Sequence, residues 1–77
     1  MRLDTLPLNR KAQIRGIDAQ ALDARAAKRL AELGFDEGVE IEALHCGPFR
    51  DPIACRVGRM TIALRRAQAQ AVLVEPA

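Results

Sequence analysis

The sequence predicts a mainly β domain, a small five-stranded antiparallel barrel with one α-helix between the first two strands. Most segments alternate apolar and polar residues, which is the pattern of a strand with one buried face. One segment near residue 30 repeats its apolar residues with a helical period instead. The chain has 77 residues, enough for one domain, residues 1–77, with one modest core.

The first segment, Leu3 to Ile17, contains the first strand. Ala12 and Ile14 alternate there with polar residues, so one face of the strand is expected to be buried. Asp18 or Asp23 can then cap the following helix, because either carboxylate can accept hydrogen bonds from the first backbone N–H groups.

The helix is indicated by apolar residues that recur every three or four positions, with charged residues between them. These apolar residues are Leu22, Ala26, Leu30 and Leu33. Gly34 is expected to end the helix in the left-handed conformation, and Phe35 should then fold back onto Leu30.

Four further strands are expected after Gly38, where the apolar period changes to two. They are residues 39–46, 53–57, 60–65 and 72–74, with a loop at residues 47–52 and a single helical turn at 66–70. The apolar positions shift by one residue between Ala43 and Leu44, which predicts a β-bulge near Ala43. Closure of the strands into a barrel would leave no unpaired sheet edge.

The charge pattern argues against nucleic-acid and membrane partners. Twelve basic and ten acidic side chains give a formal charge of +2, a balance unlike that of proteins that bind phosphate backbones. Phe35 and Phe49 are the only aromatic residues, so stacking platforms for bases are lacking. No stretch approaches the roughly 20 apolar residues of a membrane span, and the N-terminus lacks a signal-peptide pattern. We therefore expect a cytoplasmic protein without direct membrane insertion.

The sequence offers little for catalysis. It has no glycine-rich phosphate loop, and His45 and Cys46 are neighbours whose side chains point to opposite faces of a strand. A cysteine nucleophile needs a base within reach and an oxyanion site. We therefore expect that the chain is not an enzyme.

The two cysteines leave two interpretations open. If the 47–52 loop closes a hairpin, Cys46 and Cys55 lie opposite one another, and with His45 they could bind zinc or iron. Alternatively, both thiols are reduced and pack as small buried apolar side chains. The absence of CxxC and HxxxH spacings favours the second interpretation. We expect no required cofactor, and only weak or adventitious binding of a divalent transition metal such as zinc or iron.

Phe49 also has two interpretations. In the 47–52 loop it could be an exposed apolar anchor that enters a pocket of a partner. Alternatively, it could fold over the mouth of the barrel and enlarge a core that is short of aromatic residues. The loop position favours the first interpretation, and the scarcity of large apolar residues favours the second. Five further basic residues are interpreted as a solvated face, with contact to an acidic surface of a partner as the alternative; they are Arg25, Lys28, Arg29, Arg65 and Arg66.

The chain is similar to the FeoA family. The resemblance rests on the run from Arg29 to Gly38, on Asp51-Pro52-Ile53, on Gly58 and on the run from Ile62 to Arg66. These segments match the order and spacing of the family pattern RL-x-x-LGF-x-x-G, a DP-I loop and a closing ALR. Asn9 stands where the family often has glycine, a mild departure because Asn tolerates the left-handed region. The resemblance implies an SH3-like barrel that serves ferrous-iron uptake as a non-enzymatic cytoplasmic accessory protein of the membrane GTPase transporter.

We therefore expect this transporter to be the partner and the 47–52 loop to bind it. Phe49 would be the anchor, with Arg50, Asp51 and Pro52 beside it. A weak homodimer is also compatible with the sequence. The alternative is a stand-alone SH3-like metal-responsive module, similar to the domain that ends some metal-dependent repressors. The lack of a DNA-binding helix-turn-helix argues against that alternative.

Overall fold

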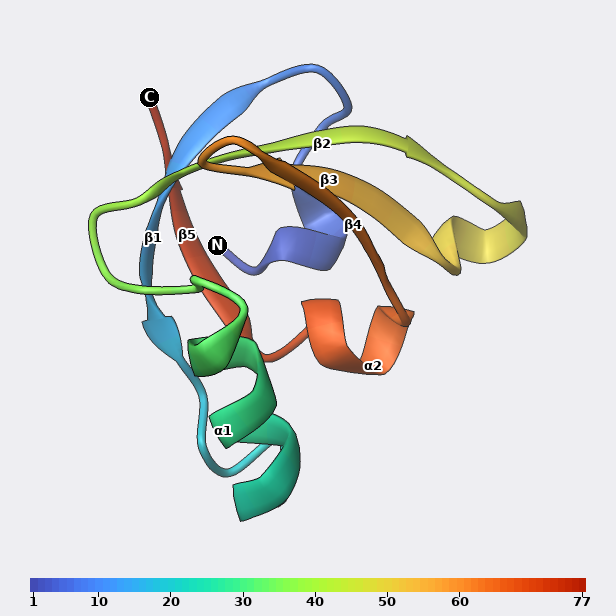
Figure 1. The fold of residues 1–77 in the computed structure, drawn as a ribbon. Coiled ribbons are helices and arrows are strands. Elements are labelled where there is room, and N and C mark those ends of the chain that lie inside the picture. The colour runs from blue at the N-terminus through green and yellow to red at the C-terminus, as the bar shows by residue number, and fades with distance from the viewer.

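The alternating segments form five antiparallel strands of one curled sheet in a computed structural model that describes residues 1–77 (Figure 1). The strands are β1 (Lys11–Ile17), β2 (Glu40–Cys46), β3 (Ile53–Val57), β4 (Met60–Leu64) and β5 (Val72–Pro76), and the sheet order is β4-β3-β2-β1-β5. The helices are α1 (Ala24–Glu32) and α2 (Arg66–Ala69), and two 3-10 turns are η1 (Leu3–Thr5) and η2 (Pro48–Arg50). None of these helices has the length and hydropathy of a membrane span. The predicted mainly β architecture is confirmed.

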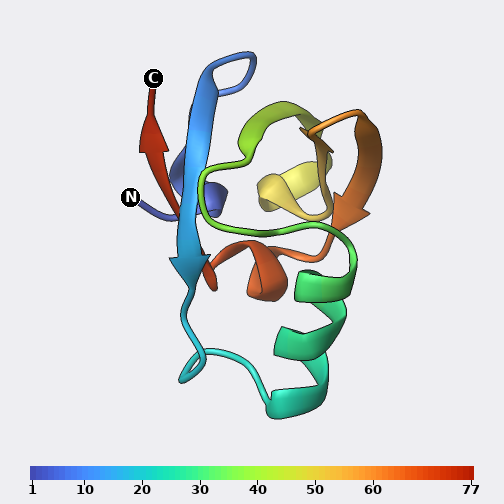
Figure 2. The same cartoon turned by 60° about the vertical axis from the view of Figure 1, so that its left-hand side comes forward.

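Helix α1 projects from one end of the curled sheet, the end at which α2 also lies (Figure 2). Asp23 caps its start, because a carboxylate oxygen of Asp23 accepts a hydrogen bond from the Ala26 N–H at 2.7 Å. The other candidate, Asp18, instead accepts from the Gln20 N–H at 3.0 Å. Leu30 is the only buried residue of α1, so this side chain fixes the helix to the core.

The end of α1 has the predicted geometry. Gly34 has a φ of +100°. The N–H of Phe35 donates to the Leu30 carbonyl, and the N–H of Gly34 donates to the Ala31 carbonyl, each at 3.1 Å. These two hydrogen bonds form a Schellman motif, and Leu30 and Phe35 belong to the same buried cluster.

Gly34→Ala should lower the free energy of unfolding by about 1 kcal/mol or more, because alanine adopts a positive φ only at a cost. A Cβ at this position would meet no heavy atom within 4 Å, so the cost is conformational rather than steric. Urea denaturation followed by circular dichroism measures the loss. Gly34→Asn is the control and should lose less, since Asn tolerates this region. An unchanged denaturation midpoint for Gly34→Ala would contradict the assignment.

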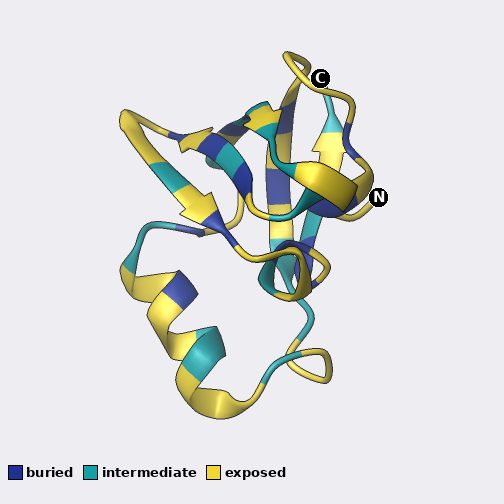
Figure 3. Cartoon of the chain, turned by 90° about the vertical axis from the view of Figure 1, so that its right-hand side faces the viewer, coloured by how far each residue is buried: buried dark blue, intermediate teal, exposed yellow.

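The core is built mostly from aliphatic side chains, and buried positions alternate with more exposed ones along the strands that supply them (Figure 3). Its members are Leu3, Leu6, Ala12, Ile14, Leu30, Phe35, Ile41, Ala43, Ile53, Cys55, Val57, Leu64, Ala69, Val72 and Val74. Leu3 and Leu6 are fully buried, so the short N-terminal segment around η1 is part of the core. This segment is therefore a firm surface on which a neighbouring loop can be fixed.

Two β-bulges adjust the facing of the strands. In β2 the register shifts between Ala43 and His45, which confirms the bulge predicted near Ala43. In β1 a second shift lies between Ile14 and Gly16, where the alternation of the sequence gave no signal. Each extra residue increases the local twist and bends the strand, which helps the sheet to curl.

The two outer strands, β4 and β5, do not pair with each other, so the barrel is not closed by a ladder of hydrogen bonds. Helix α2 connects them instead (Figure 1). The outer edge of β5 is covered by the N-terminus, because the Val74 N–H donates to the Met1 carbonyl at 2.7 Å and Arg2 forms an isolated bridge with Leu73. The expected complete closure is therefore wrong in this respect.

Candidate interaction site

The 47–52 loop joins β2 to β3 and presents Phe49 at its tip. The Phe49 side chain is 87% exposed, so the interpretation that it fills the mouth of the barrel is wrong. Both Phe49 and Arg50 are left-handed, with φ of +56° and +59°. For non-glycine residues this conformation costs about 1–2 kcal/mol each, and it persists only where neighbouring contacts hold the backbone.

Arg50 provides the first of these contacts. Its Nε donates to the Asp4 carbonyl at 2.6 Å, and its Nη2 donates to the Leu6 carbonyl at 2.8 Å. The guanidinium is thus occupied by its own chain and fixes the loop to the buried N-terminal segment. The sequence assigned Arg50 to the binding surface, and the structure shows a side chain that holds the loop in place.

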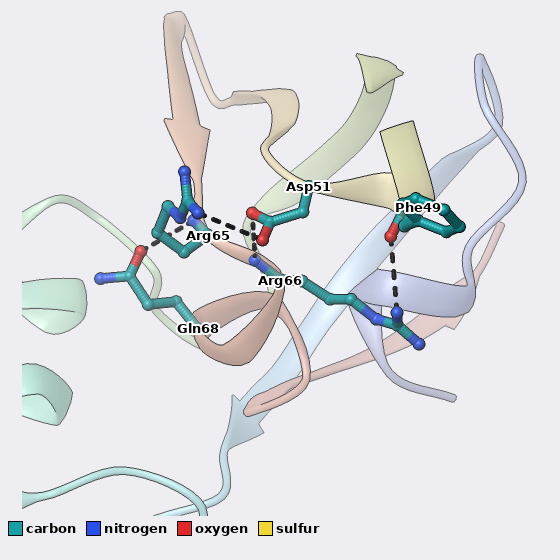
Figure 4. A network of polar contacts seen from close by, with 5 residues as sticks. All are labelled: Phe49, Asp51, Arg65, Arg66 and Gln68. Carbon is teal, nitrogen blue, oxygen red and sulfur yellow. Dashed lines mark hydrogen bonds and ion pairs between the residues drawn. The ribbon is translucent and has the colours of Figure 1, made fainter. Parts of the chain in front are cut away.

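Asp51 and Arg66 hold the loop from the side of α2 (Figure 4). The Asp51 carboxylate accepts from the backbone N–H of Arg66 at 3.2 Å and from the Arg65 guanidinium at 3.3 Å. The Arg66 guanidinium in turn donates to the Phe49 carbonyl at 3.4 Å. Because Arg65 precedes α2 without a side-chain cap, Asp51 satisfies an N–H at the start of α2 that would otherwise lack a partner.

This role of Arg65 and Arg66 was missed by sequence reasoning, which treated them as part of a solvated face. The available signal was weak: a helix that begins after an arginine lacks a capping oxygen of its own. Nothing local indicates that Asp51, some 15 residues earlier, provides one. Pro52 is exposed beside this network.

Gly47 allows the base of the loop to close tightly. A Cβ at Gly47 would lie 2.7 Å from the backbone oxygen of Asp51, too close for any other residue without a shift of the backbone. The N–H of Gly47 donates to the Pro52 carbonyl at 2.9 Å. Together with the contacts of Arg50 and Asp51, this closure makes the loop a preorganised support for an exposed phenyl ring.

The expected pairing of the two cysteines is wrong. Cys46 pairs with Ile53 because the 47–52 loop closes directly between them, and the bulge between Ala43 and His45 then places Cys55 opposite Ala43. Cys55 is fully buried, Cys46 is half-buried and His45 is exposed. No three His, Cys, Asp or Glu side chains lie close enough together to hold a metal ion. Metal binding by His45, Cys46 and Cys55 stays a prediction, which zinc titration of the parent and of Cys46→Ser would test.

Burial raises the pKa of the Cys55 thiol from 9.0 to about 11. Between these two pH values the Cys55 thiol therefore keeps its proton in the folded protein, whereas the same thiol in the unfolded chain has lost it. The protonated Cys55 thiol contributes fully to the free energy of unfolding below pH 9, and this contribution is lost as the pH rises toward the pKa of the folded state. We predict that the free energy of unfolding falls between about pH 9 and about pH 11. Urea denaturation over this range measures it, and Cys55→Ala should remove this part of the slope. An equal slope in Cys55→Ala would contradict the prediction.

A polar depression of about 430 Å³ lies beside the N-terminus; it is lined by Arg2, Asp4, Thr5, Asp18, Ala21 and Gln70. The Arg2 guanidinium contacts the Asp18 carboxylate at 3.0 Å and donates to the Gln70 carbonyl at 2.8 Å. Hydrogen bonds from the Gln20 N–H and from Arg2 lower the pKa of Asp18. These contacts keep the N-terminus in place over β5.

Comparison with known proteins gives a family match over almost the whole chain. A family model, the FeoA domain, matches residues 1–76. The Fe(2+) transport protein A/Fe(2+) transporter FeoB fusion protein of Porphyromonas gingivalis is 33% identical over 75 residues. This match covers 97% of the chain but only 8% of the fusion protein, so the chain spans a small part of that relative.

Two solved structures share the fold. The solution structure of iron(II) transport protein A from Clostridium thermocellum has a TM-score of 0.88 at 31% identity, covering 100% of this chain and 46% of that one. The crystal structure of Stenotrophomonas maltophilia FeoA complexed with zinc, described as a prokaryotic SH3 domain protein, has a TM-score of 0.86 at 34% identity. It covers 97% of this chain and 89% of that one. The expected SH3-like fold is confirmed.

Proposed function

This chain belongs to the FeoA family, and on that premise we propose that it is a non-enzymatic accessory protein of bacterial ferrous-iron uptake. It acts in the cytoplasm by binding the membrane GTPase that transports ferrous iron. One observation carries the proposal: the Porphyromonas gingivalis relative combines Fe(2+) transport protein A and the transporter FeoB in one polypeptide. A covalent link gives two domains a high effective concentration, whereas separate chains must find each other through affinity.

The 47–52 loop supports a role in binding. Phe49 is the most exposed large apolar side chain of the molecule, and a lone exposed ring is a poor contribution to folding but a good anchor for an interface. Arg50 and Asp51 already hold the loop in one conformation, so little conformational entropy is lost when a partner binds. The complementary surface on the transporter would be an apolar pocket large enough for a phenyl ring.

A co-purification experiment tests the proposed function. The tagged chain is mixed first with the soluble GTPase domain of the transporter from the same organism, and separately with the whole transporter in detergent. We expect retention of the whole transporter, and retention of the GTPase domain if the contact lies there. The control is a Leu30→Ala chain, whose fold is strongly destabilised, so it should retain less of either form than the parent chain does. Failure of the folded parent chain to retain either form would refute the proposal.

A further inference from the structure

The outer edge of β4 is an open hydrogen-bonding surface. The register pairs Val57 with Met60 across the two-residue turn of Gly58 and Arg59, and the pair that closes such a turn is a hydrogen-bonded pair. Alternation along the ladder then makes Ile62 and Leu64 hydrogen-bonded to β3 and directs the N–H and C=O groups of Thr61 and Ala63 away from the sheet. Two residues therefore offer four backbone groups to a further strand.

Unlike the edge of β5, to which the N-terminus is hydrogen-bonded, this edge makes no hydrogen bond with another segment: Thr61 and Ala63 take part in none of the backbone hydrogen bonds outside the sheet. It also lacks the usual protection of an edge strand, because residues Met60–Leu64 include no charged residue and no proline. Thr61 and Ala63 are exposed, Met60 is 39% exposed and Ile62 is half-buried. An added strand would thus also cover apolar surface that the core leaves incompletely packed.

Charge opposes pairing of this edge with a second copy of itself. Two copies could pair their β4 edges antiparallel. If the outward N–H and C=O groups of Thr61 and Ala63 are all used, Thr61 of one copy lies opposite Ala63 of the other. The same register places Arg59 opposite Arg65 at both ends of the new ladder. Both arginines are exposed, and like charges directly opposite each other are unfavourable. Arg59 and Arg65 instead favour a partner strand that places one acidic residue opposite each of them, so that its two acidic residues are six positions apart.

We propose that β4 binds an extended segment of a partner protein as a sixth, antiparallel strand, and that this segment carries an acidic residue at each end and apolar residues between them. Hydrogen bonds to Thr61 and Ala63 provide the affinity, and Arg59 and Arg65 select the charge. Arg65 also contacts Asp51 of the 47–52 loop, so the strand site and the loop are continuous. The inference goes beyond the proposed function, because it holds for any partner with such a segment.

The test uses two capped seven-residue probes, Glu-Val-Thr-Val-Thr-Val-Glu and Lys-Val-Thr-Val-Thr-Val-Lys, added to the isotope-labelled chain. We expect the acidic probe to shift the NMR amide signals of Thr61 and Ala63 first, and the basic probe to bind at least about tenfold more weakly. Shifts confined to other elements, or equal binding of both probes, would overturn the proposal.

Two variants separate the backbone from the charges. Thr61→Pro removes one outward N–H without removing a bond to β3, and proline is tolerated at such an edge position. It should weaken binding of the acidic probe about fivefold or more, whereas Thr61→Val keeps the N–H and should bind like the parent. Arg59→Glu changes an exposed turn residue and should reduce the difference in affinity between the acidic and the basic probe. This second test does not depend on whether Thr61→Pro folds. Unchanged binding in a folded Thr61→Pro, or an unchanged preference in Arg59→Glu, counts against the proposal. None of these readouts uses Phe49 or the transporter.

Discussion

Leu30→Ala is expected to lower the free energy of unfolding by about 3 kcal/mol, within the range of about 2–5 kcal/mol measured for such core truncations. Leu30 is fully buried and is the only buried residue of α1, so the variant loses apolar burial and leaves a cavity at the point where the helix meets the sheet. The same residue supplies the carbonyl that accepts the Phe35 N–H in the Schellman motif. A domain of this size is only marginally stable, so the loss is a large part of the total.

Thermal unfolding followed by circular dichroism measures this effect. In a domain of 60–100 residues each kcal/mol corresponds to about 4–8 °C in Tm, so a fall of about 12–24 °C is expected. Lys28→Ala is the matched control, because Lys28 lies on the same helix and is exposed; its effect should stay within about 0.5 kcal/mol. A Tm of Leu30→Ala within a few degrees of the parent would show that α1 is not fixed to the core through this residue.

The sequence was sufficient for the fold because its local signals agreed. An apolar period of two predicted the strands, and an apolar period of 3.6 predicted α1. The glycine after α1 predicted where the helix ends. All three signals depend only on residues close together in the sequence. The bulge near Ala43 could be predicted for the same reason, since a shift of one in the apolar pattern reverses the face of every later side chain. The bulge between Ile14 and Gly16 could not be predicted, because the alternation of apolar and polar residues ends at Gly16 and shows no change of face.

The site could be predicted only in part. A loop between prolines with one phenylalanine suggested an anchor, and the exposure of Phe49 agrees with that expectation. The contacts that hold the loop depend on the tertiary fold: Arg50 reaches the carbonyls of Asp4 and Leu6, which lie more than 40 residues earlier. The cysteine pairing failed for a related reason. The loop closes with Cys46 opposite Ile53, two residues before Cys55, and sequence spacing alone does not fix the register of a hairpin with a long loop.

Phe49→Ala is expected to weaken binding to the transporter by about 2 kcal/mol, which is roughly a 30-fold rise in Kd. The reason is that an aromatic side chain on a preorganised loop brings its whole apolar surface to the interface with little entropy to lose. The melting temperature should stay almost unchanged, because the ring is 87% exposed and contributes little to the core. Biolayer interferometry against the form of the transporter that co-purifies gives the Kd, and circular dichroism gives the Tm of the same samples.

Phe49→Leu and Arg50→Ala divide the effect between the ring and the loop that carries it. Phe49→Leu keeps an apolar side chain of similar size and should recover most of the affinity. Arg50→Ala keeps the ring but removes two charge-assisted hydrogen bonds to the N-terminal segment, so it should lower both the affinity and the Tm. If Phe49→Ala binds as tightly as the parent while Arg50→Ala binds weakly, the phenyl ring is not the anchor. The contact surface would then include the N-terminal segment that Arg50 holds against the loop.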